Sequence, residues 1–337
     1  MSDRAALVAA ARDTIAQGSQ SFAAASKLFA PATRERAWLL YAWCRAADDM
    51  TDGQELGHGA SALDDPAAAQ ARLEALTALA LYSGEEVPLP FAALRAVAHE
   101  TAMPARFIED HLAGFALDAA GWQPQSGDDL LRYCYHVAGT VGCMMAVVMG
   151  VSPQDEDTLD RACDLGLAFQ LANIARDVVP DAHAGRCYLP AEWLDAAGLD
   201  AGRLADPQAL PALAALAARL VEMARPYRRS ARVGAARLPG GWRCWPPMRS
   251  MALSGKKSWR AAPTPGTNAY GSAAEEKSCC WGKRCCAAFQ LLRQLRATGS
   301  GPGPVSPDAT ACAARRFANG AAARGAVPTA APTESQS

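Results

Sequence analysis

The chain has 337 residues, half of them hydrophobic, which is enough for one large domain or two small ones with a substantial core. Its 33 basic and 34 acidic residues nearly cancel, so no basic field points to nucleic acid as a partner. The N-terminal residues lack a secretory pattern, and the apolar stretch 137–151 is too short and too rich in glycine to span a membrane. These features predict a soluble cytoplasmic protein.

Apolar residues recur at helical spacing over residues 1 to about 238, and no alternating strand pattern competes. Helices are expected over 5–16, 34–50 (with Pro31 at its start), 66–82, 91–102, 104–120, 128–149, 153–179 and 210–236, with a loop over 183–190. The pattern predicts an all-α fold, in which long helices surround a central space. Five of the eleven cysteines lie singly in this region, which indicates reduced thiols rather than disulfides.

The composition changes near Pro239, after which Trp, Cys, Pro and Gly crowd the chain and helical periodicity fades. Three interpretations of residues 239–337 are open. A zinc module does not fit, because adjacent cysteines such as Cys279 and Cys280 lack the usual gap and no histidine follows His183. A disordered tail suits residues 301–337.

The third interpretation, which we favour, is that residues after about 239 are translated out of frame. The codons for Cys279-Cys280-Trp281 permit Leu-Leu when they are read across their boundaries. A shift throughout residues 248–270 and 277–289 permits sequences far more typical of helices than those written. Either a lesion in the gene or a sequencing error would produce this pattern.

A first acidic cluster ends the expected helix 34–50. Asp48 and Asp52 are four residues apart and share a helix face, with Asp49 beside them. Like charges at this spacing destabilise a helix by roughly 0.2–0.5 kcal/mol, so a cation is expected nearby. Arg45 lies one turn earlier and can pair with Asp48 or bind a phosphate oxygen. Taken alone, the cluster fits a solvated helix end better than a site.

A second polar stripe lies in the expected helix 153–179 and just beyond it. Its members follow at steps of three or four residues and are Gln170, Asn173, Asp177 and Asp181. Such a stripe in an apolar helix is costly unless it faces water, metal or ligand. Arg176 and Arg186 are close enough in sequence to neutralise phosphate. The lesser alternative is a buried salt bridge of Asp177 with one of these arginines. Hard oxygen ligands in small number suit Mg²⁺, which typically bridges carboxylates and substrate phosphates.

Two further stretches carry weaker signals. Residues 133–142, Tyr-Cys-Tyr-His-Val-Ala-Gly-Thr-Val-Gly, contain small residues that allow close helix packing or leave room for a flat hydrocarbon. Alone, this stretch fits plain helix packing better. Ser19 and Ser21 can donate hydroxyls to a phosphate, or Ser19 can simply begin a helix.

Taken together, these stretches resemble the squalene and phytoene synthase family of head-to-head prenyl-diphosphate condensing enzymes. The resemblance covers Ser19 to Pro190 and extends more weakly to Pro239, and residues 133–142 and 185–190 look most like bacterial phytoene synthases. It implies an isoprenoid-synthase-like helical bundle as the catalytic domain, residues 1–238. It also implies Mg²⁺ (or Mn²⁺) bound by Asp48, Asp52, Asp177 and Asp181; diphosphate bound by Ser19, Ser21, Arg45, Gln170, Asn173, Arg176 and Arg186; and a cavity lined by Tyr41, Tyr133 and Tyr135.

The resemblance implies condensation of two geranylgeranyl diphosphates to phytoene through a cyclopropyl diphosphate, in carotenoid biosynthesis. Two alternatives stay open: squalene or dehydrosqualene synthesis from farnesyl diphosphate, and a catalytically dead bundle that binds lipid or a partner. No glycine-rich dinucleotide fingerprint is present, so NADPH is not expected. Peripheral membrane contact for product release and contact with other carotenoid enzymes are further expectations.

The chain departs from the family pattern at two places. Pro180 stands where the family usually has an acid, and an interior proline costs about 3 kcal/mol, so it is expected to kink the helix and move Asp181 from metal reach. In the family, the last helices close the cavity and contain the motifs Val-Tyr-x-x-Ile-Gly and Ala-Trp-Asp. Neither motif is present in the printed sequence, and both appear in the shifted frame. The protein with the printed sequence is therefore expected to lack this wall of the cavity.

Resequencing the gene across codons 235 to 290 is expected to reveal a change of reading frame. The reason is that the written residues there lose helical periodicity while a shifted frame restores it. A confirmed, uninterrupted frame would contradict this interpretation.

Overall fold

The computed structural model describes residues 3–53 and 64–235, and all regular elements in these ranges are helical. The predicted all-α class is therefore confirmed. The α-helices are α1 (Arg4–Gly18), α2 (Gln20–Ser26), α3 (Pro31–Asp52), α4 (Pro66–Tyr82), α5 (Leu89–Thr101), α6 (Ala105–Ala119), α7 (Gly127–Cys134), α8 (Thr140–Val148), α9 (Glu156–His183), α10 (Ala191–Ala197) and α11 (Leu210–Ala235). The segment η1 (Tyr135–Gly139) is π-helical, and η2 (Ala201–Arg203) and η3 (Pro207–Ala209) are short 3₁₀ turns. The predicted second segment, 239–337, lies outside the described residues.

Local sequence signals set most helix boundaries. Asp65 caps α4 by accepting a hydrogen bond from the Ala68 amide, and Pro66 takes the first helical position. Gly53 ends α3 in the left-handed conformation, with φ of 60°, which only glycine adopts without strain. The short helix α10 was not predicted from the sequence, and α2 only as the alternative that Ser19 begins a helix, because each has only seven residues and little periodicity to detect.

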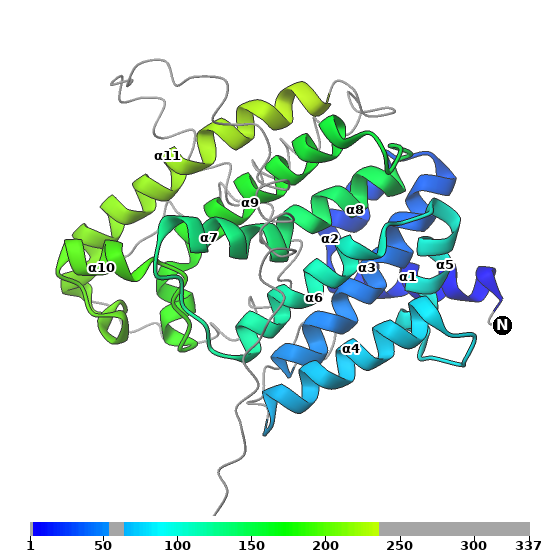
Figure 1. The fold of residues 1–337 in the computed structure, drawn as a ribbon, viewed down its shortest axis with the longest axis horizontal. Coiled ribbons are helices and arrows are strands. Elements are labelled where there is room, and N and C mark those ends of the chain that lie inside the picture. Colours follow the sequence, from blue (N-terminus) through cyan, green and yellow to red (C-terminus); the bar gives the residue numbers. More distant parts are fainter. Residues whose placement is uncertain (1–2, 54–63, 236–337) are drawn as a thin grey trace, which may run out of the picture.

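Two groups of helices flank a central layer. Figure 1 shows α3 and α4 side by side on one side of the molecule and α9 and α11 along the other. Helix α3 packs against α1, α4 and α5, and α9 packs against α8 and α11. Between the groups lie α6, η1 and α8, which contact one another. This arrangement brings the ends of α3 and α9, far apart in sequence, to the same region.

The helices of the central layer pack closely because glycines lie where their backbones cross. A Cβ built on Gly142 would lie 2.2 Å from the backbone oxygen of Ala162, and one on Gly166 would lie 2.1 Å from that of Ala138. The backbones of η1, α8 and α9 therefore meet directly. The predicted single helix over 128–149 is instead interrupted by η1, which widens one turn at this contact.

The predictions on thiols and membrane spans can be compared with the structure. Five cysteines in the described ranges are free, four of them buried, which confirms the prediction of reduced thiols there: Cys44, Cys134, Cys143, Cys163 and Cys187. None of the helices in the same ranges has the length and hydropathy needed to cross a membrane.

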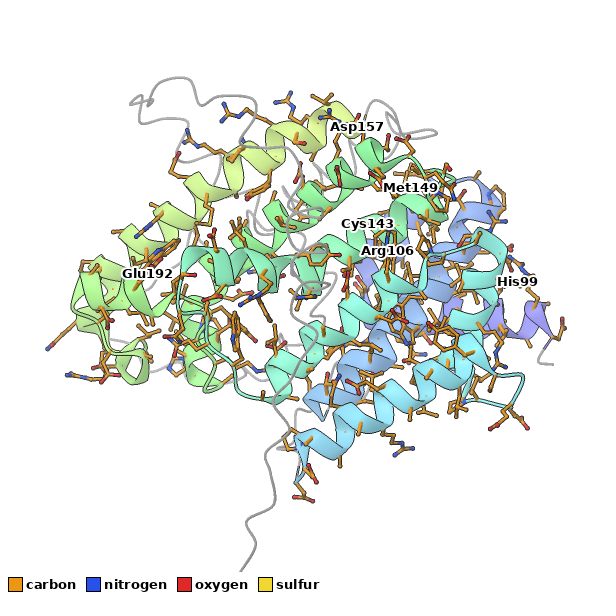
Figure 2. The ribbon with its side chains drawn as sticks, viewed as in Figure 1. His99, Arg106, Cys143, Met149, Asp157 and Glu192 are labelled. Carbon is orange, nitrogen blue, oxygen red and sulfur yellow. The ribbon has the colours of Figure 1, made fainter. Side chains whose placement is uncertain are left out.

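A buried acid lies between α9 and α11. Asp164 is 1 % exposed, and its carboxyl group hydrogen-bonds with Ser230 of α11. Burial raises the pKa of Asp164 from 3.8 to about 6, against the opposing effect of the Ser230 hydrogen bond. Figure 2 shows Asp157, at the N-terminal end of α9, beside the C-terminal end of α11. The two helices therefore run antiparallel, and Asp164 lies in the interface between them.

Gly142→Ala is expected to destabilise the fold by more than about 2 kcal/mol, because the added methyl group would overlap a backbone oxygen that cannot rotate away. Urea unfolding followed by circular dichroism measures this change. Gly84→Ala is the matched control, since a Cβ there meets nothing within 4 Å, and it should leave stability nearly unchanged. Equal midpoints for the two variants would contradict the close-packing argument.

Asp164→Asn is expected to stabilise the protein at pH 7 by about 1–3 kcal/mol. Between pH 4 and pH 6 the unfolded chain loses the Asp164 proton before the folded chain does, so rising pH favours unfolding of the wild type. The asparagine has no proton to lose, so the advantage should grow from pH 4 to pH 6 and then stay constant. Unfolding free energies measured from pH 4 to pH 8 test this. A pH-independent difference would contradict it.

Candidate active site

The last turn of α3 concentrates negative charge. Asp48 and Asp49 each have side chains 17 % exposed, and Asp52 is the final helical residue. Carboxylates at a helix C-terminus oppose the helix dipole and repel one another. Arg45 lies below them with a side chain only 1 % exposed, 3.3 Å from Asp48 and 3.1 Å from Asp49. The predicted pairing of Arg45 with Asp48 is confirmed.

The polar stripe of α9 lies partly in the core. Gln170 and Asn173 are buried, whereas Asp177 and Asp181 are half-buried. Among the residues that the structure describes, none hydrogen-bonds to the buried Oδ1 atom of Asn173. An orphaned buried acceptor costs free energy, which a bound donor or cation would recover. Arg176 makes a two-point contact with Asp177, so the salt-bridge alternative is present in this structure.

Pro180 does not end α9. The helix continues through it to His183, so Asp181 stays helical one turn beyond Asp177. Pro180 lies in the last turn, where the lost amide removes one backbone bond and little helix follows to be displaced. Asp181 therefore remains on α9, and the expectation that Pro180 moves it from metal reach stays a prediction.

An ion pair links the acidic end of α3 to the loop that follows α9. The Arg186 guanidinium lies 2.6 Å from the Asp52 carboxylate, although 134 residues separate them. Arg186 follows α9, after a turn in which Gly185 has φ of +73°. Burial lowers the pKa of Arg186, but the charges of Asp52, Tyr188 and Asp118 outweigh this and raise it overall. The end of α3 therefore lies within one side-chain length of the loop that follows α9.

All three predicted cavity tyrosines are buried, and two of them, Tyr133 and Tyr135, donate hydrogen bonds to acids of α6. Tyr133 donates to both oxygens of Asp118 at 3.1 Å, and Tyr135 donates to Asp110. Burial and the Asp110 hydrogen bond raise the pKa of Tyr135, so it stays protonated. Tyr41 is 2 % exposed, with its ring 5.7 Å from that of Phe22.

Of the two N-terminal serines predicted to bind phosphate, the structure describes the side chain of Ser19 only. Ser19 is buried and caps α2, accepting a hydrogen bond from the Phe22 amide at 3.3 Å. The helix-start interpretation is therefore seen for Ser19, which does not prevent its hydroxyl from donating elsewhere. The Ser21 side chain lies outside the described part of the structure, so its predicted role is untested.

Helix α6 contributes two acids that the sequence reasoning missed. Asp110, Gly114 and Asp118 are spaced four residues apart and therefore lie on one face of α6. On this face the two carboxylates lie on either side of the glycine. Gly114 meets Val137 and His136, and His136 Nδ1 donates to the Asp110 carbonyl at 2.8 Å. His111 in turn donates from Nδ1 to the His136 carbonyl at 3.0 Å. The four-residue spacing of the two acids could have identified this face.

The donor set fits a hard divalent cation in its chemistry. Carboxylates of α3 and α9 would supply oxygen ligands, and the Arg186–Asp52 contact joins the end of α3 to the loop that follows α9. Within residues 3–53 and 64–235, no three His, Cys, Asp or Glu side chains are already gathered as ligands of one ion. Arginines instead contact Asp48, Asp49, Asp52 and Asp177.

Comparison with known proteins identifies the family. The family model described as squalene/phytoene synthase matches residues 15–256. The chain belongs to the squalene/phytoene synthase family. It is 52 % identical over 233 residues to a 15-cis-phytoene synthase of a Paracoccus species, covering 69 % of this chain and 75 % of that protein. It is 53 % identical over 230 residues to a 15-cis-phytoene synthase of Pantoea ananas, covering 67 % of this chain and 74 % of that protein.

Solved structures show the same helical fold. A dehydrosqualene synthase in complex with ligand superposes with a TM-score of 0.64 at 23 % identity, covering 88 % of this chain and 97 % of that chain. A squalene synthase from Alicyclobacillus acidocaldarius gives a TM-score of 0.65 at 19 % identity, covering 88 % of this chain and 96 % of that one. The predicted family and isoprenoid-synthase-like fold are confirmed.

Proposed function

We propose that this protein condenses two geranylgeranyl diphosphates head to head to form phytoene, in carotenoid biosynthesis. The observation that carries the chemistry is the Arg186–Asp52 contact, because it brings the acidic end of α3 to the acidic end of α9. Relatives more than 50 % identical to this chain are named 15-cis-phytoene synthases, which supports phytoene as the product.

The proposed roles follow from residue chemistry. Carboxylates suit divalent metal, and buried arginines and amides suit diphosphate oxygens. We assign Mg²⁺ (or Mn²⁺) to Asp48, Asp52, Asp177 and Asp181, and diphosphate to Arg45, Arg176, Arg186, Gln170, Asn173, Ser19 and Ser21. The isoprenoid chains would lie beside Tyr41, Tyr133 and Tyr135. The orphaned Asn173 Oδ1 supports a ligand on this side of α9.

On substrate binding, the arginines of the site would exchange their carboxylate partners for phosphate oxygens. The bound metal would supply positive charge that neutralises the leaving diphosphate. Arg45, Arg176 and Arg186 would turn from the carboxylates they contact now to phosphate oxygens, which bind guanidinium groups bidentately.

The reaction has two steps, and each step releases one diphosphate and one proton. The first substrate loses diphosphate to leave an allylic cation, the double bond of the second attacks it, and loss of a proton closes a cyclopropyl diphosphate. Loss of the second diphosphate, rearrangement and loss of another proton give phytoene. Buried aromatic side chains keep water from the cations, since water would quench them as alcohols.

The product suggests where the protein works. Phytoene is a C40 hydrocarbon with no polar group, so its transfer into water is strongly unfavourable. We infer that a cytoplasmic protein would release it by peripheral contact with a membrane or by transfer to the next carotenoid enzyme.

The purified full-length protein with Mg²⁺ and labelled geranylgeranyl diphosphate is expected to release pyrophosphate and a C40 hydrocarbon. Asp177→Ala should lower turnover by about 10²–10³-fold or more, because charge stabilisation of the leaving group is lost. Asp206→Ala is the matched control: Asp206 also contacts an arginine, Arg203 at 2.9 Å, but on an exposed surface.

Three outcomes would contradict the proposal in different ways. Unchanged turnover in Asp177→Ala would remove the metal role of the second cluster. A C30 product from farnesyl diphosphate, with no C40 product, would identify a squalene or dehydrosqualene synthase. Binding of geranylgeranyl diphosphate without turnover would identify the catalytically dead bundle.

A further inference from the structure

Asp118 links two segments that are distant in sequence. It lies in the last turn of α6, and its Oδ1 atom accepts hydrogen bonds from Tyr133 at 3.1 Å and from Tyr188 at 3.0 Å. Its Oδ2 atom is also 3.1 Å from the Tyr133 hydroxyl. Tyr133 belongs to α7, whereas Tyr188 belongs to the loop 184–190 that follows α9. One carboxylate therefore ties this loop to two helices.

The same tyrosines form an aromatic stack. The rings of Tyr133 and Tyr188 are 4.9 Å apart and nearly parallel, at 20°. Trp122 stacks on Tyr133 with centroids 5.8 Å apart. Such pairs add about 0.5–1.5 kcal/mol beyond the burial of their area, so the stack and the carboxylate together hold Tyr188 in one place.

Arg186 lies two residues before Tyr188. Its backbone amide donates to the Asp181 carbonyl at 2.9 Å, which anchors the start of the loop, and Tyr188 anchors the end. Between these anchors the Arg186 guanidinium reaches Asp52 of α3. The negative charge of Asp118 also acts on this guanidinium, as its contribution to the raised pKa of Arg186 indicates.

We propose that Asp118 is a positioning residue: by accepting from Tyr188, it holds the loop 184–190 so that Arg186 faces the acidic end of α3, ready to bind diphosphate. This role rests on the proposed function, in which Arg186 contacts the substrate diphosphate. A carboxylate suits the task because both of its oxygens accept, and two hydroxyls donate to it at once. An asparagine would direct its NH₂ group at one position where a hydroxyl now donates.

The test uses two variants in the full-length protein, Asp118→Asn and Tyr188→Phe. Each removes contacts to the loop while keeping the size of the side chain. Asp118→Asn is expected to raise KM for the prenyl diphosphate about tenfold, with kcat changed by less than about threefold. The size follows by analogy with residues that orient metal ligands, whose loss typically costs about 10–100-fold in metal affinity or activity. Tyr188→Phe should act in the same direction, and the double variant should be no worse than Asp118→Asn, because both disrupt one link.

A second readout does not depend on turnover. Calorimetric titration with inorganic pyrophosphate in the presence of Mg²⁺ should show about tenfold weaker binding in Asp118→Asn than in the wild type. Tyr82→Phe is the matched control: Tyr82 also donates to a carboxylate of α6, Glu109 at 2.6 Å, but on the exposed surface. It should leave KM and pyrophosphate affinity unchanged.

Two results would overturn the positioning role. One is a lower unfolding temperature with unchanged KM and pyrophosphate affinity, which would mean that Asp118 only stabilises the fold. The other is a fall in kcat at constant KM. If the wild type forms no hydrocarbon from any prenyl diphosphate, the proposed function fails, and pyrophosphate affinity alone then decides the role of Asp118. Tyr188→Phe keeps the test valid if Asp118→Asn does not fold.

Discussion

The contact between Arg186 and Asp52 is the interaction on which the rest of the candidate site depends. Three carboxylates crowd the last turn of α3, where both their mutual repulsion and the helix dipole oppose them. Arg45 contacts two of these carboxylates from within the same helix, and Arg186 contacts the third from another part of the chain. Compensation by arginine keeps the cluster charged and folded while leaving it free to exchange partners.

Close backbone packing in the central layer gives this contact its geometry. Gly114, Gly142 and Gly166 let α6, α8, η1 and α9 approach with little side-chain volume between them. The π-helical segment then aims Tyr135 and His136 at α6, where Asp110 and its carbonyl receive them. Tyr133 and Tyr135 are thus fixed by hydrogen bonds to a helix that has no residue in either acidic cluster. A site assembled on packed helices holds its charges more rigidly than one carried by loops alone.

Much of the fold followed from local patterns. Seven of the eight predicted helices are present within a few residues, and the eighth, 128–149, is interrupted by η1. Apolar spacing and capping residues such as Asp65 and Gly53 act over short distances, so they can be recognised in the sequence. The short helix α10 and the π-helical turn η1 were missed, since their backbone conformation reflects packing rather than periodicity. The helix continues through Pro180 because the proline lies near the end of α9 and leaves few backbone bonds to break.

The sequence by itself determined the all-α class and the two acidic stripes, because residues four apart in a helix must share a face. It also determined that Arg45 can reach Asp48 within one turn. Only the tertiary structure decided that Arg186 meets Asp52, and that Asp118 on α6 joins Tyr133 to Tyr188. These partners lie 15 to 134 residues apart. No local rule specifies such pairs, because they form only when whole helices pack against one another.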